Sequence, residues 1–301
     1  MMSKMKLELL FVAGMVLSCL NVEARKTWNL DGRKIVFIGN SFIYYGGCVY
    51  DGGVRSQDEG FFWQLCKCNG EHVKVYNCTY GGHHLRDFTP AGCMSPKLHI
   101  KEHRHCPGVG TNLLKDVPLD DMDVVFMSEA GENNGHIIDD IKSVKACFPN
   151  PKTKFYYLVH TYTYYKQHRA ILDNLKQMEE MGITIVPWGQ VVYDLTEGKV
   201  RMRESHHVYS PTDFIKNKGD NYHPNPLSGY LTALAAYCAV TGKSAVGQRY
   251  DFVEQLIPAE RFVQRHYRTA ADTSYPQIIG SRKDMKVLQR LVDKTLRKYM
   301  K

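Results

Sequence analysis

Five short apolar runs, rich in β-branched and aromatic residues, limit what this chain can fold into. An almost continuous apolar run of this length is typical of a strand that is buried on both faces, as in a parallel sheet. Longer segments with helical spacing lie between and after these runs. The predicted strands are Lys34–Gly39, His72–Cys78, Asp123–Ser128, Lys154–His160 and Ile183–Pro187.

The helices predicted from the same pattern have the lengths needed to cover such a sheet. Pro226 in the first turn of one helix and Gly242 after its end are typical start and stop residues. Strands alternating with helices predict the α/β class: a three-layer α/β/α sandwich around a central, mainly parallel five-stranded sheet. In such a sheet, ligands bind at the carboxyl ends of the strands. The predicted helices are Glu59–Lys67, Tyr164–Met181, Pro226–Val240 and Val287–Tyr299.

Residues 1–24 have the pattern of a signal peptide. Lys4 and Lys6 precede the apolar run Leu9–Leu20, and Ala24 closes a small-x-small cleavage site. A second interpretation makes Cys19 the lipidated cysteine of a lipoprotein signal. No later run is apolar enough to span a bilayer. We therefore expect a secreted or periplasmic protein without an integral membrane span.

Residues 25–301 are predicted to form a single domain, because no internal repeat or low-complexity linker divides them. The segment around 86–120 lacks clear periodicity and is rich in cysteine and histidine. We interpret this segment as an insertion between two elements of the sheet domain.

The cysteines of this chain favour disulfides over a metal site. Eight of them follow the signal segment, and an even number in an exported protein predicts disulfides, here in the region Cys48–Cys147. The spacing His99-x-x-x-His103, with Cys93 and Cys106 nearby, is the alternative indication of structural zinc. Since no complete Cys-x-x-Cys pair is present, we expect no metal and no cofactor.

The net charge of +8 is concentrated toward the carboxyl terminus. Such a run is usually the solvated face of a helix, and the alternative is contact with an acidic glycan or an anionic surface. No nucleic-acid recognition module accompanies the charge, so nucleic acid is not an expected partner. The basic residues of this run are Arg282, Lys283, Lys286, Arg290, Lys294, Arg297, Lys298 and Lys301.

A serine, a histidine and an aspartate stand where the predicted sheet would expose them. Ser41 follows the first predicted strand at a tight turn, where its hydroxyl would reach the mouth of the sheet. Asp220 precedes His223 by three residues, a spacing that places both on one short turn. There the aspartate can accept the imidazole N–H and stabilise the imidazolium as the serine loses its proton.

Four segments, in chain order, resemble the blocks of the SGNH (GDSL-like) hydrolase superfamily. Asn40 stands where GDSL members have Asp, and Asn134 stands where the third block usually ends in Asp. The resemblance implies the flavodoxin-like three-layer fold of that superfamily and a serine hydrolase. The segments are Gly39–Phe42, Asn77–Gly82, Gly131–Asn134 and Asp220–His223.

The roles that the resemblance implies are specific to single residues. Ser41 would be the nucleophile, His223 the general base and acid, and Asp220 the residue that orients His223. The oxyanion hole would consist of the backbone N–H groups of Ser41 and Gly82 and the side-chain amide of Asn133. Gly81 in place of Gly82, and Asn134 in place of Asn133, are the alternatives left open.

The expected reaction is hydrolysis of a carboxylic ester, with removal of acetyl or other short acyl groups from glycans. Aromatic and polar residues after the strands favour sugar rings over a long acyl chain. The alternatives are a lipase or thioesterase of the same superfamily, or a catalytically silent glycan-binding relative. The oligomeric state is open. The residues of this rim are Tyr44, Tyr45, Tyr50, His83, His84, Tyr162, Tyr164 and Tyr165.

Overall fold

The computed structural model of the chain describes residues 27–49, 60–79, 81–89, 117–129, 135–160, 172–217, 220–253 and 281–300. The predicted signal segment 1–24 and most of the predicted insertion around 86–120 lie outside these residues. Within them, no helix is both long enough and apolar enough to cross a bilayer.

The centre of the fold is a five-stranded sheet in which every pair of neighbours is parallel. The strand order is β2-β1-β3-β4-β5, so the direction of winding reverses between β1 and β3. The predicted sheet is confirmed, with ends that differ by a few residues. The strands are β1 (Lys34–Gly39), β2 (Lys74–Thr79), β3 (Val124–Met127), β4 (Lys154–Leu158) and β5 (Ile183–Val186).

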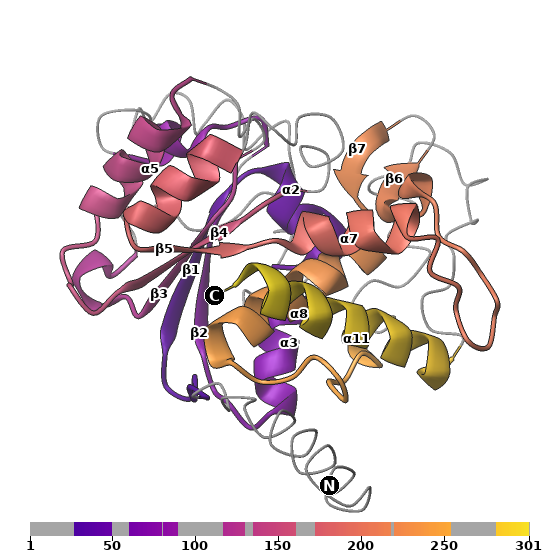
Figure 1. The fold of residues 1–301 in the computed structure, drawn as a ribbon. Coiled ribbons are helices and arrows are strands. Elements are labelled where there is room, and N and C mark those ends of the chain that lie inside the picture. The colour runs from indigo at the N-terminus through magenta and orange to yellow at the C-terminus, as the bar shows by residue number, and fades with distance from the viewer. Residues whose placement is uncertain are drawn as a thin grey trace, which may run out of the picture.

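Helices cover both faces of the sheet and complete the three layers (Figure 1). Four helices pack on one face around a core that includes Phe37, Phe62 and Phe126, all fully buried. On the other face, α5 (Ile137–Ala146) and the helical residues 172–180 cover Val36 and Ile38. The helices of the first face are α3 (Phe61–Cys68), α7 (Trp188–Glu197), α8 (Pro226–Thr241) and α11 (Arg282–Tyr299).

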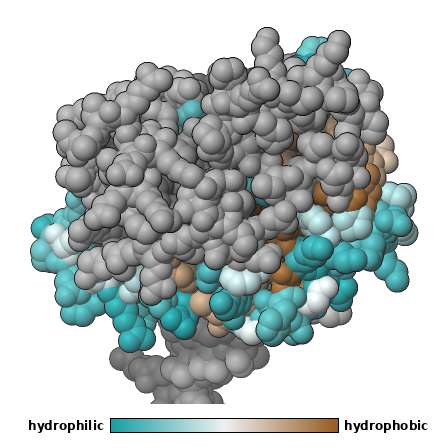
Figure 2. Space-filling view, turned by 180° about the vertical axis from the view of Figure 1, so that it is seen from behind, coloured by the Kyte–Doolittle hydropathy of each residue, from teal (hydrophilic) through white to brown (hydrophobic). Residues whose placement is uncertain are grey.

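Short elements join the layers, most of them at the carboxyl ends of the strands; the turn Leu119–Asp121 instead precedes β3. They are α2 (Ser41–Tyr44), the 3₁₀ turns η1 (Tyr45–Gly47), η3 (Leu85–Phe88), η5 (Leu119–Asp121) and η6 (Pro211–Phe214), and the antiparallel pair β6 (Ile215–Asn217) and β7 (Asp220–Pro224). Both α2 and β7 lie near the same end of the sheet (Figure 1). From behind, the described surface is mainly hydrophilic, with apolar residues at its right-hand side (Figure 2).

Two predicted helices differ from the observed ones at their ends. α11 begins at Arg282 rather than at residue 287, because the Ser281 side chain caps it by accepting from the N–H groups of Lys283 (3.1 Å) and Asp284 (3.3 Å). Of the predicted helix Tyr164–Met181, residues 172–180 are described and helical.

The cysteines do not confirm the predicted disulfides. All the described cysteines carry thiols: Cys48, Cys66, Cys68, Cys78, Cys147 and Cys238. Burial raises the pKa of the Cys66 thiol well above its usual value, which keeps this group protonated and unreactive. The prediction of a disulfide stays open for Cys93 and Cys106, which lie outside the described residues.

Candidate active site

The turn after β1 presents Ser41 at the point where the winding of the sheet reverses. A Cβ at Gly39 would lie 2.6 Å from the Ser128 carbonyl oxygen and 2.7 Å from Ile43 Cδ1, so the chain needs glycine to make this turn. The Asn40 side chain accepts from the Phe42 N–H at 3.1 Å and starts α2. Ser41 is consequently fixed and only 7% exposed.

His223 reaches Ser41 from the far end of the sequence. Its Nε2 atom lies 2.9 Å from Ser41 Oγ, across a separation of 182 residues. His223 belongs to β7, and Asn225 directly after it caps α8 by accepting from the Ser228 N–H at 3.1 Å. Asn225 also donates to the Asp213 carbonyl at 2.6 Å, which ties the end of β7 to η6. The histidine is therefore held by a helix cap and a hairpin rather than by a free loop.

A close contact between two glycines fixes the distance between α8 and η1, the turn that follows α2. A Cβ at Gly229 would lie 2.1 Å from the Gly46 carbonyl oxygen, and a Cβ at Gly46 would lie 2.3 Å from the Asn225 carbonyl oxygen. Gly46 also has a φ of +82°, in the region that favours glycine. The segment after Ser41 and the segment after His223 thus touch through their backbones.

Asp220 is the first residue of β7, and its side chain lies outside the described part of the structure. The expectation that Asp220 and His223 share a short turn is wrong, because both belong to an extended strand. The residues Asp220–Pro224 lack the apolar alternation that is typical of a strand, so their sequence does not predict one. Contact between Asp220 and the second ring nitrogen of His223 stays a prediction.

Gly82 lies in the turn after β2, close to the nucleophile turn. Its φ of +73° requires glycine, whereas a Cβ there would meet nothing within 4 Å. Backbone conformation rather than lack of space therefore selects glycine at this position. A Cβ at Gly81 would lie 2.9 Å from the Tyr44 hydroxyl. Asn133 and Asn134 lie outside the described residues, so neither is placed relative to Ser41.

A buried carboxylate that the sequence analysis missed anchors the loop that contains Gly82. Glu129, two residues after the end of β3, is fully buried, accepts from the Leu85 N–H at 2.8 Å and contacts His84 Nδ1 at 3.0 Å. On the opposite side of the loop, the Asn40 side chain donates to the His83 carbonyl at 3.2 Å. The loop is thus tied both to the nucleophile turn and to the end of β3. The available signal was a lone Glu directly after an apolar strand.

A second histidine lies under the site. His160 follows β4, is fully buried, and packs its ring against Phe42 at 3.7 Å and Trp188 at 5.6 Å between ring centroids. Burial, with a smaller contribution from His223, holds its pKa well below the usual value. His160 is therefore neutral and fills the floor beneath Phe42, whose ring centroid also lies 5.5 Å from that of His223.

The described residues of the predicted aromatic rim differ in how far they are exposed. Tyr44 is 4% exposed and packs in the core, with its hydroxyl close to Gly81, so it is not part of an open rim. His83 and His84 are half-buried beside Gly82. Among the described residues, no group of three or more His, Cys, Asp or Glu side chains is arranged to hold a metal ion. The residues of the alternative zinc site, around His99 and Cys106, lie outside these ranges.

Comparisons with known proteins give distant structural neighbours. A protein described as a GDSL-like lipase, from Parabacteroides merdae, aligns with 72% of this chain and 99% of its own, at 14% identity and a TM-score of 0.42. A family two carbohydrate esterase from Clostridium thermocellum, solved with cellohexaose, aligns with 70% of this chain and 64% of its own, at 14% identity and a TM-score of 0.35. An active-site mutant of a family two carbohydrate esterase from the same organism aligns with 72% of this chain and 65% of its own, at 14% identity and a TM-score of 0.36.

No protein family matches this sequence, and no curated protein matches it. At 14% identity and TM-scores below 0.5, the structural neighbours do not assign a family or a function to the chain.

Proposed function

We propose that this protein is a serine hydrolase that cleaves carboxylic esters, with Ser41 as nucleophile and His223 as general base. One observation carries the proposal: the 2.9 Å contact between Ser41 Oγ and His223 Nε2, at the carboxyl edge of a parallel sheet. A serine hydroxyl is a weak nucleophile until a base takes its proton, and this contact supplies that base. Asp220 completes the proposed triad by orienting the imidazole.

The reaction proceeds in two displacements. Ser41 Oγ attacks the acyl carbon while its proton moves to His223 Nε2, and the protonated imidazole then donates that proton to the departing alcohol. A water molecule next loses a proton to His223 and attacks the acyl-serine carbon. This attack forms a tetrahedral intermediate, whose collapse releases the carboxylic acid while His223 returns the proton to Ser41 Oγ. No electron transfer and no further reactant besides water is needed.

The proposed oxyanion hole uses donors from three turns. They are the backbone N–H groups of Ser41 and Gly82 and the side-chain amide of Asn133. The anchoring of the Gly82 loop by Glu129 and Asn40 supports the second of these donors, because a fixed donor is worth more to the transition state than a mobile one.

The proposed substrates are short acyl esters of glycans. The observation that favours a small acyl group is the confinement of Ser41, which is 7% exposed and lies beside Phe42, itself packed on His160. The half-buried His83 and His84 add polar groups suited to hydroxyl-rich alcohols. A lipase or thioesterase, and a silent glycan-binding protein, are the alternatives that the assay below separates.

The test is a turnover series on 4-nitrophenyl esters of increasing acyl length, with the wild type and Ser41→Ala. We expect hydrolysis of acetate to exceed that of octanoate, and Ser41→Ala to lose activity by several powers of ten without a change in melting temperature. Preference for octanoate would favour a lipase or thioesterase. An inactive wild type, or an active Ser41→Ala, would reject the proposed mechanism.

A further inference from the structure

The exposed side of α11 carries only positive charge. The helix has seven basic and two acidic side chains, a net charge of +5 out of the chain's +8. Asp284 is buried and accepts from the N–H groups of Glu204 (2.7 Å) and Ser205 (3.0 Å). Asp293 accepts from the Ala245 N–H and the Ser244 hydroxyl, both at 2.6 Å. All seven basic residues are exposed: Arg282, Lys283, Lys286, Arg290, Lys294, Arg297 and Lys298.

Five of these residues form a narrow basic stripe along the helix: Lys283, Lys286, Arg290, Lys294 and Arg297. At ~100° and 1.5 Å per residue, they share one line of the surface and span about 20 Å. No member of the stripe forms a salt bridge with a residue that the structure describes. Like charges four residues apart, and positive charge in the first helical turn, destabilise a helix. Lys283 and the like-charged neighbours along the stripe therefore lower the stability of the helix, whereas Arg297, in the last turn, interacts favourably with the helix dipole.

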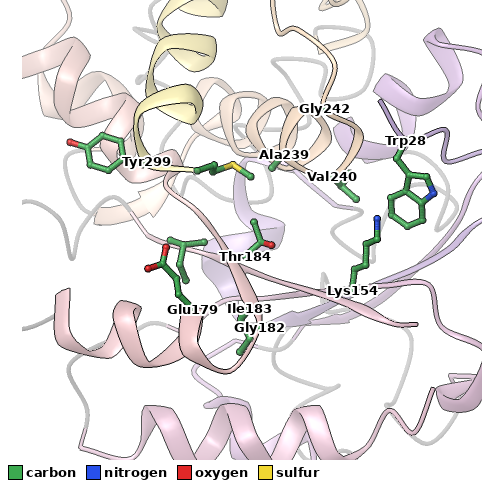
Figure 3. A pocket seen from close by; sticks show the side chains of 12 residues that line it. Trp28, Lys154, Glu179, Gly182, Ile183, Thr184, Ala239, Val240, Gly242 and Tyr299 are labelled. Atoms are coloured by element: carbon green, nitrogen blue, oxygen red, sulfur yellow. The ribbon is translucent and has the colours of Figure 1, made fainter. Parts of the chain in front are cut away.

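A cavity of about 670 Å³ opens at the carboxyl end of the stripe. Trp28 and Tyr299 stand on opposite sides of it, with Thr184 between them (Figure 3). Two cations contact the Trp28 ring: the Lys154 ammonium lies 3.6 Å and the Arg33 guanidinium 5.5 Å from its centroid. The ammonium of Lys298 lies 4.7 Å from the Tyr299 ring, so the basic surface of α11 continues to the rim of the cavity.

The cavity is separate from the candidate active site. It is lined by the first residues of β4 and β5, Lys154 and Ile183, and thus lies at the amino edge of the sheet. Ser41 follows the last residue of β1 and lies at the carboxyl edge. Because all five strands are parallel, these edges are at opposite ends of the strands.

The chemistry of the cavity and the stripe points to one ligand class. A concave site with an aromatic residue on each side and an apolar floor at Ala239 and Val240 suits a sugar ring. Glu179 also lines the cavity, and its carboxylate can accept hydrogen bonds from sugar hydroxyl groups but would repel a carboxylate, so the acidic groups of the ligand belong on the stripe. Exposed lysine and arginine side chains bind carboxylates through charge-assisted hydrogen bonds. We propose that the cavity and the basic stripe of α11 together bind a linear acidic polysaccharide, with one sugar between Trp28 and Tyr299 and its carboxylates along the stripe.

Two other polyanions fit the surface less well. A basic helix that binds a membrane inserts its apolar face into the lipid, but Met285, Leu288 and Val292 are at most 1% exposed. Duplex DNA presents phosphates that exposed lysines and arginines can bind, but its bases are stacked inside the helix and offer no ring to the cavity between Trp28 and Tyr299. This inference does not depend on ester hydrolysis at Ser41.

Binding of fluorescent polygalacturonate to the purified full chain, followed by anisotropy, tests the proposal. We expect binding that weakens as salt rises from about 20 to 500 mM, because screening shortens the reach of exposed charges. The triple variant Lys286→Glu, Arg290→Glu, Lys294→Glu should bind at least about tenfold more weakly, as should Tyr299→Ala. The matched control is Lys142→Glu, Lys152→Glu, Lys176→Glu, which makes the same charge change on exposed residues elsewhere and should bind within about twofold of the wild type.

Several outcomes would overturn the proposal. They are no binding by the wild type, an equal loss in the control variant, unchanged binding by Tyr299→Ala, and equal binding of fully methyl-esterified polygalacturonate, which lacks the charge. Tighter binding to vesicles of anionic lipid, or to duplex DNA, would also reject it in favour of those partners. If the triple variant does not fold, Arg290→Gln with Lys294→Gln replaces it, with an intermediate loss expected. Acetate ester turnover should be unchanged in the triple variant, so failure here is distinguishable from failure of the proposed mechanism.

Discussion

Single residues at the candidate site are fixed by contacts that differ in kind. Asn40 is bonded on two sides, to the Phe42 N–H and to the His83 carbonyl, and so joins the nucleophile turn to the Gly82 loop. His160 packs as an uncharged ring beneath Phe42, because burial lowers its pKa. Glu129 acts by charge, as a fully buried acceptor.

His160 should make the protein sensitive to mild acid. Its pKa in the fold lies below the value of about 6.5 that it has when unfolded, so the unfolded chain binds the extra proton as the pH falls. The stabilising effect of the neutral ring is complete above pH ~6.5 and declines below it, by up to about 1.4 kcal/mol per pH unit. Between pH 7 and 5, the free energy of unfolding of His160→Gln should fall less steeply than that of the wild type. His136→Gln, at an exposed position, should fall as steeply as the wild type. An identical dependence of the free energy of unfolding on pH in all three proteins would contradict this assignment.

Glu129 should affect turnover as well as stability. Glu129→Gln keeps the size of the side chain but loses one acceptor and the charge, so the bond to His84 or to the Leu85 N–H is broken. If that loop carries an oxyanion donor, kcat should fall about tenfold or more while KM changes little. Measuring kcat, KM and melting temperature on one preparation decides the matter. A lower melting temperature with unchanged kcat would limit Glu129 to a structural role.

Secondary-structure elements explain why the site could be predicted only in part. The five strands of the sheet were predictable because burial on both faces demands apolar residues throughout. β6 and β7 were not, since Ile215–Asn217 and Asp220–Pro224 carry mostly polar residues and pair only with each other. α7 was missed because it follows β5 after a single residue and begins with Trp188 and Gly189, which give no start signal. Ser41 and His223 are identifiable in the sequence from their positions and from the resemblance, whereas the contact between them is visible only in the fold.

The contact between Gly46 and Gly229 should be the least tolerant joint between elements. Gly229→Ala would place a Cβ 2.1 Å from the Gly46 carbonyl oxygen, so η1 and α8 must move apart. We expect a loss of about 1–3 kcal/mol in the free energy of unfolding and lower ester turnover, because α2 precedes η1 directly. Gly135→Ala is the control, since a Cβ there meets nothing within 4 Å. Equal stability of the two variants in urea would show that the joint is not tight.

At the scale of the whole molecule, the two edges of one sheet carry two different kinds of site. The carboxyl edge holds the Ser41–His223 pair, and the amino edge holds the cavity between Trp28 and Tyr299. The sequence predicts the first edge as the place of the ligand, because parallel strands bring their carboxyl ends together. The charge of α11 reads in the sequence as a solvated helix face, since a sequence alone does not show that a cavity lies at the end of that helix.

The central claim is that His223 activates Ser41, and covalent labelling with a fluorophosphonate tests it most directly. Displacement of fluoride by Ser41 Oγ leaves a stable adduct that peptide mass mapping locates. The account predicts one adduct, at Ser41, that is absent in Ser41→Ala and forms at least a hundredfold more slowly in His223→Ala of unchanged melting temperature. An adduct at another serine, or wild-type labelling of Ser41 in His223→Ala, would contradict it.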